Sequence, residues 1–306
     1  MRKLLPLAAV AVFALTFSAC TDTEVQGTGE KETTEDSAVE PEHFDPLSIE
    51  AVPDIQAMVP ADIAASGKLV SGTSANQAPG EFRHKGSLTG YNIEIVQALG
   101  QVMGLQGTVR EAEFQSIIPG LGREFDIGVS SLTISPERLE KANMISYLEV
   151  GSAFAVARGN PADFSPEDPC GSTLGVQAGT YQEDIVELWS KKCVEDKKKP
   201  IELLSLDTQR EVNAQITDGS CDATLADSPV ITYAVLNSSG RLQQIGDVIQ
   251  SEPQGIAVAL ADEQLTVAIQ AAMQYLMDEH YLEAILTSYD AEDVALTQAE
   301  INPGKR

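Results

Sequence analysis

The stretch Val129–Arg138, VSSLTISPER, joins the end of an apolar run to the start of a helix. Ser135, Pro136 and Glu137 form the pattern of a helix N-terminus, with an N-cap serine, a proline at the first helical position and an acid in the first turn. Arg138 follows, and a cation in a first turn opposes the helix dipole at a cost of about 0.3–1 kcal/mol when exposed. We therefore expect Arg138 to hold an anion.

Strand-like and helix-like patterns alternate along the chain from Lys68 onward. The predicted strands are 68–74, 125–132, 152–159, 173–179, 221–227 and 255–260, and the predicted helices are 91–105, 181–193, 228–238 and 265–289. This alternation is typical of an α/β fold with largely parallel sheets. In such folds, ligands bind outside the carboxyl ends of strands, where helices begin.

Polar side chains gather at three of these strand ends. The first holds Arg138; the second, GVQAGTYQED, holds Thr180 and Glu183 in capping-box spacing, which offers backbone N–H groups to an anion. In the third, ATLADSPV, Asp227 follows an apolar strand. Each cluster also fits a purely structural helix cap, an alternative that the sequence leaves open. Gathered at one crevice, an arginine, an aspartate and several hydroxyls match a zwitterion.

The first residues, MRKLLPLAAVAVFALTFSAC, combine a basic start with a short apolar run that closes on Cys20. This is the pattern of a secretory signal peptide, predicted over 1–19. The letters FSAC resemble a lipobox, so we expect Cys20 to carry lipid and anchor the protein on the outer face of the cell membrane. An ordinary signal peptide with a chance cysteine is the alternative. The acidic, polar segment that follows predicts a disordered tether over 20–59.

The chain is strongly acidic, with a formal net charge of −26 at pH 7. Loss of Arg2 and Lys3 with the signal peptide makes this about −28, which argues against binding to nucleic acid or to anionic lipid headgroups. The remaining 255 or so residues suit one large or two small domains.

The cysteines predict one disulfide. With Cys20 assigned to lipid, Cys170, Cys193 and Cys221 remain, and two of them can pair in an oxidising compartment. We favour Cys170 with Cys193, which would fasten the start of a strand to the end of the following helix, and expect Cys221 to be an inert core thiol. The three histidines lie at no ligand spacing from a cysteine, so neither a metal nor a cofactor is predicted.

Seven motifs follow one another in the order and spacing of a known family: GKLVSGTSANQAPGEF, GYNIEIVQALG, FQSIIPGL, DIGVSSLTISPER, GVQAGTYQE, CDATLADSPV and PQGIAVA. From about residue 66 to residue 290 the chain resembles the polar amino-acid substrate-binding proteins of ABC importers, family 3 solute-binding proteins, of the actinobacterial lipoprotein type. The resemblance implies the periplasmic-binding-protein fold, in which two hinge-linked α/β lobes close on a ligand.

The family layout assigns residues 60–152 plus 256–306 to lobe 1 and residues 153–255 to lobe 2. The implied hinge consists of the segments GSAFAVA and PQGIAVA. Two crossings of this kind restrict the lobes to a bending motion.

The resemblance also implies roles for individual residues. Arg138 looks like the family arginine that binds the ligand's α-carboxylate, assisted by Ser131 and Thr133, and Asp227 resembles the carboxylate that takes the α-ammonium. The other implied contacts are Thr180 and Tyr181 at a helix N-terminus, Phe114 as a wall beside the ligand, and Gln182 near the side-chain pocket.

The opening loop departs from the family pattern at two positions that we expect to line the site. Ser74 stands where an acid is common, and Gln77 stands where an aromatic residue stacks on the ligand. Without that acid, a desolvated ammonium or guanidinium lacks a partner, so we expect a neutral polar amino acid such as glutamine. Arg83, His84 and Lys85 are expected to be solvated turn residues.

A zwitterion bridging Arg138 and Asp227 on opposite lobes would favour the closed form. The implied protein is a monomer whose partners are an ABC permease and its ATPase. Two alternatives share the fold: a sensor without transport, and an enzyme like cyclohexadienyl dehydratase acting on prephenate or arogenate. Glu81 and His84 are the nearby acid-base candidates, but neither has a recognisable partner in the sequence, so no catalytic residue is predicted.

Overall fold

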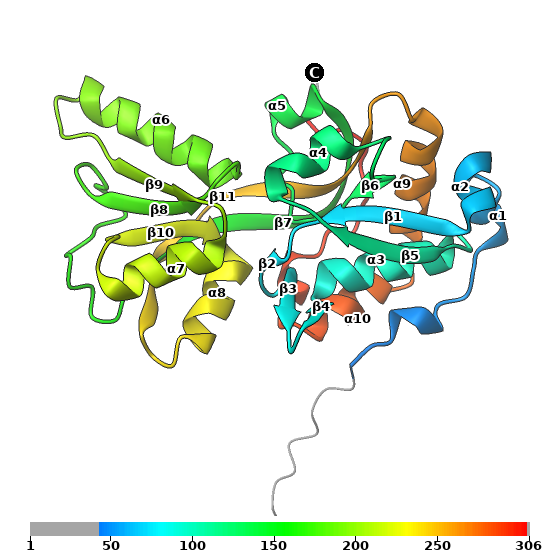
Figure 1. Ribbon diagram of the computed structural model, residues 1–306, viewed down its shortest axis with the longest axis horizontal. Helices are drawn as coiled ribbons and strands as arrows, with labels where there is room; N and C mark the ends of the chain where they lie inside the picture. The colour runs from blue at the N-terminus through cyan, green and yellow to red at the C-terminus, as the bar shows by residue number, and fades with distance from the viewer. Residues whose placement is uncertain (1–42, 305–306) are drawn as a thin grey trace, which may run out of the picture. The chain divides into compact units, whose positions relative to one another are not determined.

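The computed structural model describes residues 43–304 (Figure 1). The predicted signal peptide, Cys20 and most of the predicted tether lie outside these residues. The strands of an eight-stranded mixed sheet follow the order β5-β1-β6-β11-β7-β10-β8-β9. Its two ends form the sheets of lobe 1 and lobe 2.

Lobe 1 is built on the parallel strands β5 (Gln106–Glu111), β1 (Lys68–Thr73) and β6 (Ile127–Gly128). Helix α3 (Tyr91–Val102) is almost wholly buried and packs with α9 (Glu263–Asp278) and α10 (Tyr281–Thr287) around the larger hydrophobic core. The smaller elements of this lobe are η1 (Pro46–Ser48), α1 (Pro53–Gln56), α2 (Ala61–Ser66), β2 (Asn76–Gln77), β3 (Glu81–His84), β4 (Ser87–Thr89), η2 (Phe114–Ser116), α4 (Ile117–Gly120), α5 (Pro136–Leu139) and η3 (Glu292–Val294).

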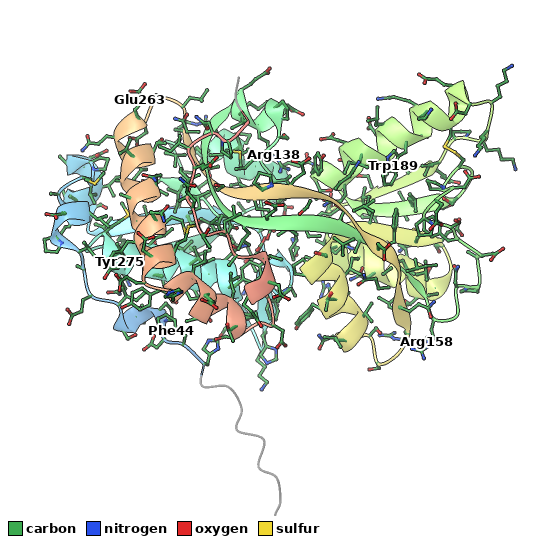
Figure 2. The ribbon with its side chains drawn as sticks, turned by 180° about the vertical axis from the view of Figure 1, so that it is seen from behind. Phe44, Arg138, Arg158, Trp189, Glu263 and Tyr275 are labelled. Atoms are coloured by element: carbon green, nitrogen blue, oxygen red, sulfur yellow. A yellow bond between two sulfur atoms is a disulfide. The ribbon has the colours of Figure 1, made fainter. Side chains whose placement is uncertain are left out.

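Lobe 2 repeats the plan with parallel strands β9 (Glu202–Leu206), β8 (Thr173–Gln177) and β10 (Ala223–Asp227). Its helices are α6 (Tyr181–Glu195), α7 (Gln209–Asp218) and α8 (Ser228–Asn237). Trp189 lies on α6 (Figure 2). It stacks on Phe154, with ring centroids 6.0 Å apart, in a core separate from that of lobe 1.

Two long antiparallel strands, β7 (Ala142–Ala157) and β11 (Leu242–Ala259), run through both lobes. Both predicted hinge segments lie within them. Strand β7 is buried along nearly all of its length, so its apolar residues face packed neighbours on both sides. The pairing shifts register between Ile245 and Ile249 and again before Glu252, as β-bulges do where a strand bends.

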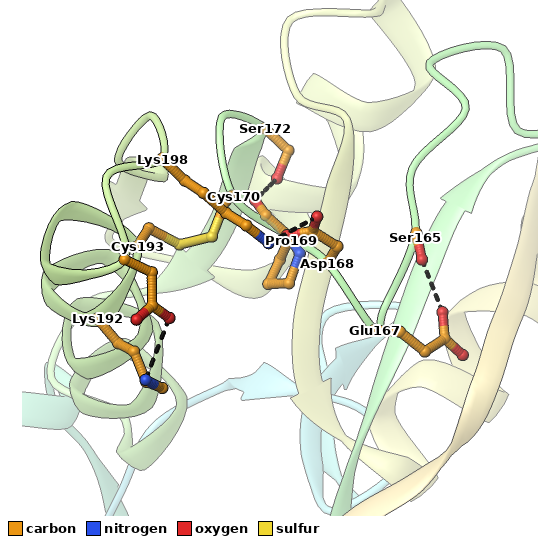
Figure 3. Close-up of polar contacts among 10 residues, drawn as sticks. Ser165, Glu167, Asp168, Pro169, Cys170, Ser172, Lys192, Cys193 and Lys198 are labelled. Carbon is orange, nitrogen blue, oxygen red and sulfur yellow. Dashed lines mark hydrogen bonds and ion pairs between the residues drawn. A yellow bond between two sulfur atoms is a disulfide. The ribbon is translucent and has the colours of Figure 1, made fainter.

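The predicted disulfide joins Cys170 to Cys193 with an S–S distance of 1.99 Å (Figure 3). It ties the segment before β8 to the end of α6. Nearby, the Lys198 ammonium donates to both carboxylate oxygens of Asp168, at 2.9 Å each. Cys221 is a buried free thiol, as expected.

The predicted end of the tether at residue 59 is wrong. Ile49, Ile55 and Val59 are buried in the core of lobe 1, and the Val52 N–H donates to the Val102 carbonyl at 2.9 Å. These apolar residues recur too sparsely to predict an element, but all three belong to the same hydrophobic core as α3 and α9. Residues from Ile49 onward therefore belong to the fold of lobe 1.

Three other predicted elements also differ from the structure. The helix predicted over 265–289 is two helices, because His280 adopts the left-handed φ of 59° between α9 and α10. The strand predicted over 125–132 is paired only at Ile127–Gly128. The last strand, β11, begins at Leu242 rather than at 255. Within residues 43–304, no helix is both long and apolar enough to cross a membrane.

Candidate functional site

Arg138 lies where the two lobes meet (Figure 2). Its Nη1 donates to the Thr133 carbonyl of lobe 1 at 2.8 Å, and its Nη2 donates to the Gly179 carbonyl of lobe 2 at 3.0 Å. The guanidinium carbon is 5.5 Å from the centre of the Phe114 ring, within cation–π range. A guanidinium has five N–H donors, so others remain for an anion.

Helix α5 begins as predicted, with the Ser135 side chain accepting from the Arg138 N–H at 3.3 Å and Pro136 in the first turn. The helix is only one turn long, so the dipole that Arg138 opposes is small. Burial lowers the pKa of Arg138, and the carboxylates of Asp184 and Asp227 partly offset that effect. The two carbonyls and the Phe114 ring hold the guanidinium in place.

Asp227 ends β10 and is 7% exposed. Its Oδ1 accepts from Gln182 Nε2 at 2.8 Å, and its Oδ2 accepts from Gln254 Nε2 at 2.6 Å. Burial raises the pKa of Asp227 to about 6, against the two amide hydrogen bonds and the charge of Arg138, which lower it. Although Asp227 occupies the N-cap position of α8, its side chain makes no capping bond. Helix capping therefore does not explain this buried carboxylate.

Thr180, by contrast, is a structural cap. Its Oγ1 accepts from the Glu183 N–H at 3.3 Å and donates to the Gln177 carbonyl at 2.8 Å. The Glu183 side chain accepts from the Gly179 N–H at 2.6 Å, so one N–H group expected to face an anion is already occupied. Tyr181 points its hydroxyl toward Glu252, at 3.4 Å, whereas Gln182 reaches Asp227.

A buried carboxyl network at Glu81 is the main feature that the sequence did not reveal. Glu81 is fully buried and accepts from Asn92 Nδ2 at 2.6 Å, Ser130 Oγ at 2.8 Å and Ser131 Oγ at 3.3 Å. Burial, with a smaller contribution from the charge of Asp227, raises the pKa of Glu81 to about 8, against the hydrogen bonds from Asn92, Ser130 and Ser131, which lower it. His84, the other acid-base candidate, is exposed.

The Glu81 network fixes the loop that carries the predicted hydroxyls. Ser131 adopts the left-handed φ of 50°, a conformation that costs a non-glycine residue energy and that clusters at functional sites. Ser130 accepts from the Ser74 N–H at 3.0 Å, which links this loop to the opening loop. Thr133 is buried and pairs with Gln254 in an isolated β-bridge.

Unsatisfied polar atoms mark the centre of the site. Five buried side-chain N or O atoms lack a hydrogen-bond partner within residues 43–304, and four of them are Ser74 Oγ, Gln77 Oε1, Gln177 Nε2 and Gln254 Oε1. Leaving such a group unpaired costs about 1–3 kcal/mol. Gln254 binds Asp227 and Ser74 binds the Glu81 loop through Ser130, so their unpaired oxygens are available to a small molecule there.

Gln77 and Gln177 form a polar pair across the lobes. Gln77 Nε2 donates to Gln177 Oε1 at 3.1 Å, which leaves one acceptor and one donor free. Exchanging O and N in both amides still leaves one of each, so this property does not depend on how the amides are oriented. Gln177 and Gln254 belong to the motifs GVQAG and PQGIAVA. A polar residue inside an apolar strand is the feature of the sequence that could have identified them as site residues.

The described residues hold no group of three His, Cys, Asp or Glu side chains that could bind a metal ion. The ionisable groups described above for the site are the guanidinium of Arg138 and the carboxyls of Asp227 and Glu81. This arrangement can pair with an anion and a cation on the same small molecule.

The sequence matches the model of a known family, bacterial extracellular solute-binding proteins, family 3, over residues 69–291. The chain is a family 3 solute-binding protein. The family identified from the motifs is thereby confirmed. The arginine-binding protein ArgT of Corynebacterium glutamicum is 33% identical over 296 residues, covering 96% of this chain and 93% of that protein. The L-cystine-binding protein TcyJ of Escherichia coli K12 is 23% identical, covering 74% of this chain and 84% of its own length.

Solved structures place this solute-binding protein in the two-lobed periplasmic-binding-protein fold. An ancestral arginine-binding protein bound to arginine superposes with a TM-score of 0.66 at 27% identity and covers 73% of this chain and 98% of its own. An ancestral arginine-binding protein bound to glutamine also superposes with a TM-score of 0.66 at 27% identity, covering 73% of this chain and 97% of its own. The α/β fold class and the two hinge-linked lobes predicted from the sequence are therefore confirmed.

Proposed function

We propose that this solute-binding protein captures a free amino acid between its lobes, outside the cytoplasmic membrane, and delivers it to the permease and ATPase of an ABC importer. The observation that carries the proposal is the convergence of Arg138, Asp227 and four unsatisfied buried atoms where the lobes meet. The arginine-binding and cystine-binding relatives support the same class of ligand.

In the proposed complex, the α-carboxylate binds the remaining N–H donors of Arg138, with Ser131 and Thr133 beside it. The α-ammonium binds Asp227, whose two oxygens already accept from Gln182 and Gln254. A carboxylate oxygen can accept more than one hydrogen bond, so these amides and an ammonium can share Asp227. Phe114 forms a wall on the other face of the Arg138 guanidinium.

The ligand's side chain is proposed to be a neutral amide, as in glutamine. The Gln77–Gln177 pair presents one free acceptor and one free donor, which match the NH₂ and C=O of an amide. Ser74 brings a hydroxyl rather than a charge, and the raised pKa of Glu81 keeps that carboxyl mostly neutral at pH 7. Arginine is the competing ligand, because several relatives are arginine-binding proteins. Structures of an ancestral arginine-binding protein contain either arginine or glutamine.

Glu81 is assigned a positioning role rather than a catalytic one. It is fully buried and bonded to Asn92, Ser130 and Ser131, so it holds the binding loop in place. The lipid on Cys20 and the monomeric state belong to the same proposal, since a tethered monomer keeps captured ligand near its permease.

The test is isothermal titration of the mature protein with glutamine, asparagine, citrulline, arginine, lysine and cystine. We expect glutamine to bind most tightly, and expect Gln77→Ala and Gln177→Ala to weaken glutamine binding. The control is Gln298→Ala, which removes an exposed glutamine of lobe 1 and should change nothing. Tightest binding of arginine would overturn the side-chain assignment alone. Binding of no amino acid would overturn the function.

A further inference from the structure

A cavity of about 700 Å³ lies between the lobes, with walls formed by strands β2 and β3 of lobe 1 and helices α7 and α8 of lobe 2. In Figure 1 these two helices lie beside the strands. None of Arg138, Asp227 and Phe114 lines this cavity. Its volume falls in the range of small-molecule sites, about 300–1,000 Å³.

Two helices each turn one continuous face toward this cavity. From α7, Arg210, Asn213 and Thr217 line it at spacings of three, four and seven. From α8, Tyr233 and Asn237 do so four residues apart. Such spacing places side chains on one side of a helix, so the lining consists of whole helix faces rather than of scattered loop residues.

The charge of the lining is opposite to that of the chain. The protein carries a formal charge of −26, yet three of the seven arginines among residues 43–304, Arg83, Arg210 and Arg241, line this one cavity. The only acid in the lining, Glu111, pairs with Arg83. Arg241 Nε donates a hydrogen bond to the Ser238 carbonyl at 3.0 Å, which leaves the two terminal nitrogens of Arg241 for another partner.

Arg210 stands in the first turn of α7, where a cation opposes the helix dipole. Helix α7 is ten residues long, whereas α5 is a single turn. The unfavourable interaction of Arg210 with the helix dipole is therefore larger than that of Arg138. An anion bound at Arg210 would offset this unfavourable interaction with the dipole, and Arg241 lines the same cavity.

We propose that this cavity binds a small organic or inorganic polyanion, such as a di- or tricarboxylate or a phosphate, between Arg210 and Arg241. Tyr233 and Phe82, whose ring centroids are 5.4 Å apart, bring the two lobes together at the cavity wall. An anion seated there contacts lobe 2 through its arginines and lobe 1 through Asn76 and Arg83. Because these contacts coexist only when the lobes are together, the anion favours the closed form.

The structure thus assigns the cavity a second role, coupling the anion to amino-acid capture. An anion that favours closure also tightens amino-acid binding. Because such coupling is reciprocal, the amino acid tightens anion binding by the same factor. The coupling rests on the proposed function, whereas binding of the anion itself does not.

The experiment measures binding of citrate and of inorganic phosphate by titration calorimetry, first without amino acid, in NaCl buffers of matched ionic strength. We expect saturable binding of at least one anion, and the two arms distinguish carboxylate from phosphate chemistry. Arg210→Ala/Arg241→Ala should abolish the binding. The control, Lys197→Ala/Lys199→Ala, removes the same charge from exposed lysines of lobe 2 outside the cavity and should retain it.

The second measurement repeats the amino-acid titration with the anion present. We expect the anion to lower the amino-acid Kd by a factor of about 5 or more in the wild type and not in the arginine variant. Binding of neither anion, or equal binding by the arginine variant, would overturn the site. Anion binding with an unchanged amino-acid Kd would overturn the coupling alone, and failure of every amino acid to bind would overturn the proposed function while leaving the anion result intact.

Discussion

Arg138 touches both lobes through backbone carbonyls, so it is oriented without an acidic partner in direct contact. Truncating it would leave the ligand carboxylate buried and unpaired. We predict that Arg138→Ala raises the amino-acid Kd at least about 30-fold, corresponding to about 2 kcal/mol or more. Arg123→Ala, which removes an exposed arginine of lobe 1, is the charge-matched control. An unchanged Kd for Arg138→Ala in calorimetry would contradict the assignment.

Asp227 makes ligand binding depend on pH. Burial raises its pKa to about 6, and the α-ammonium of a ligand favours the ionised form, so the ligand must displace a proton when it binds below that pH. We predict that amino-acid affinity weakens as pH falls through about 6 and that binding there releases protons into the buffer. Calorimetry in buffers of different ionisation enthalpy measures the release. In Asp227→Asn, affinity should be lower overall and the pH dependence near 6 should disappear.

Glu81 affects the free energy of unfolding in the opposite direction from a typical paired carboxylate. Its pKa is about 8 in the folded protein against a reference value of 4.5, so the folded state binds this proton more tightly than the unfolded state. Stability is therefore lost as pH rises from about 4.5 to 8, because the folded protein must then hold a buried charge. We predict that Glu81→Gln flattens this part of the stability profile, as measured by urea unfolding at several pH values. Parallel profiles for variant and wild type would show that another group is responsible.

At the scale of elements, the sequence predicted the strands and helices that have a strong apolar period and missed those stabilised by distant contacts. The predicted helix over 91–105 is α3, and the strand over 221–227 contains β10. Strands β5 and β9 have little alternation and are ordered by parallel pairing with β1 and β8. Pairing partners far apart in the chain leave no local pattern, so these elements could not be predicted.

The same limit applies to the site. Arg138 lies at the start of a helix and Asp227 at the end of a strand, where fold rules and motifs both point, so they could be found in the sequence. The partners of Glu81 are 11, 49 and 50 residues away, and nothing in the sequence brings them together. Tyr181 and Gln182 are adjacent in the chain, and only the phase of α6 decides which of them reaches Asp227.

The disulfide acts on one element pair, the entrance to β8 and the end of α6, across 23 residues of sequence. Closing a loop of that length stabilises a fold by about 3 kcal/mol, chiefly by restricting the unfolded chain. We predict that Cys170→Ser/Cys193→Ser lowers the Tm by roughly 5–10 °C. Reductant should lower the Tm of the wild type by a similar amount and leave the double variant unchanged. A variant that melts with the wild type would show that the bond adds no stability.

At the scale of the whole folded part, three kinds of contact bring the lobes together away from the crossing strands. They are the Arg138–Gly179 hydrogen bond, the Gln77–Gln177 amide pair and the Phe82–Tyr233 ring pair. Each is a single neutral hydrogen bond, a single charged-donor hydrogen bond or a single ring contact, so the lobes need further contacts to stay together. A zwitterion adds charged contacts to both lobes at once, which is the differential interaction that a shift toward closure requires.

We therefore predict that the amino acid makes the protein more compact. Small-angle X-ray scattering should show a smaller radius of gyration at saturating amino acid than in its absence, because β7 and β11 permit bending but keep the lobes attached. Asp227→Asn keeps Arg138 in lobe 1 but weakens the grip of lobe 2, so at equal occupancy it should close less completely than the wild type. Gln298→Ala should close like the wild type. If the ligand binds with its expected affinity and the scattering does not change, binding does not depend on closure, and the two-lobed site must already be assembled before the ligand arrives.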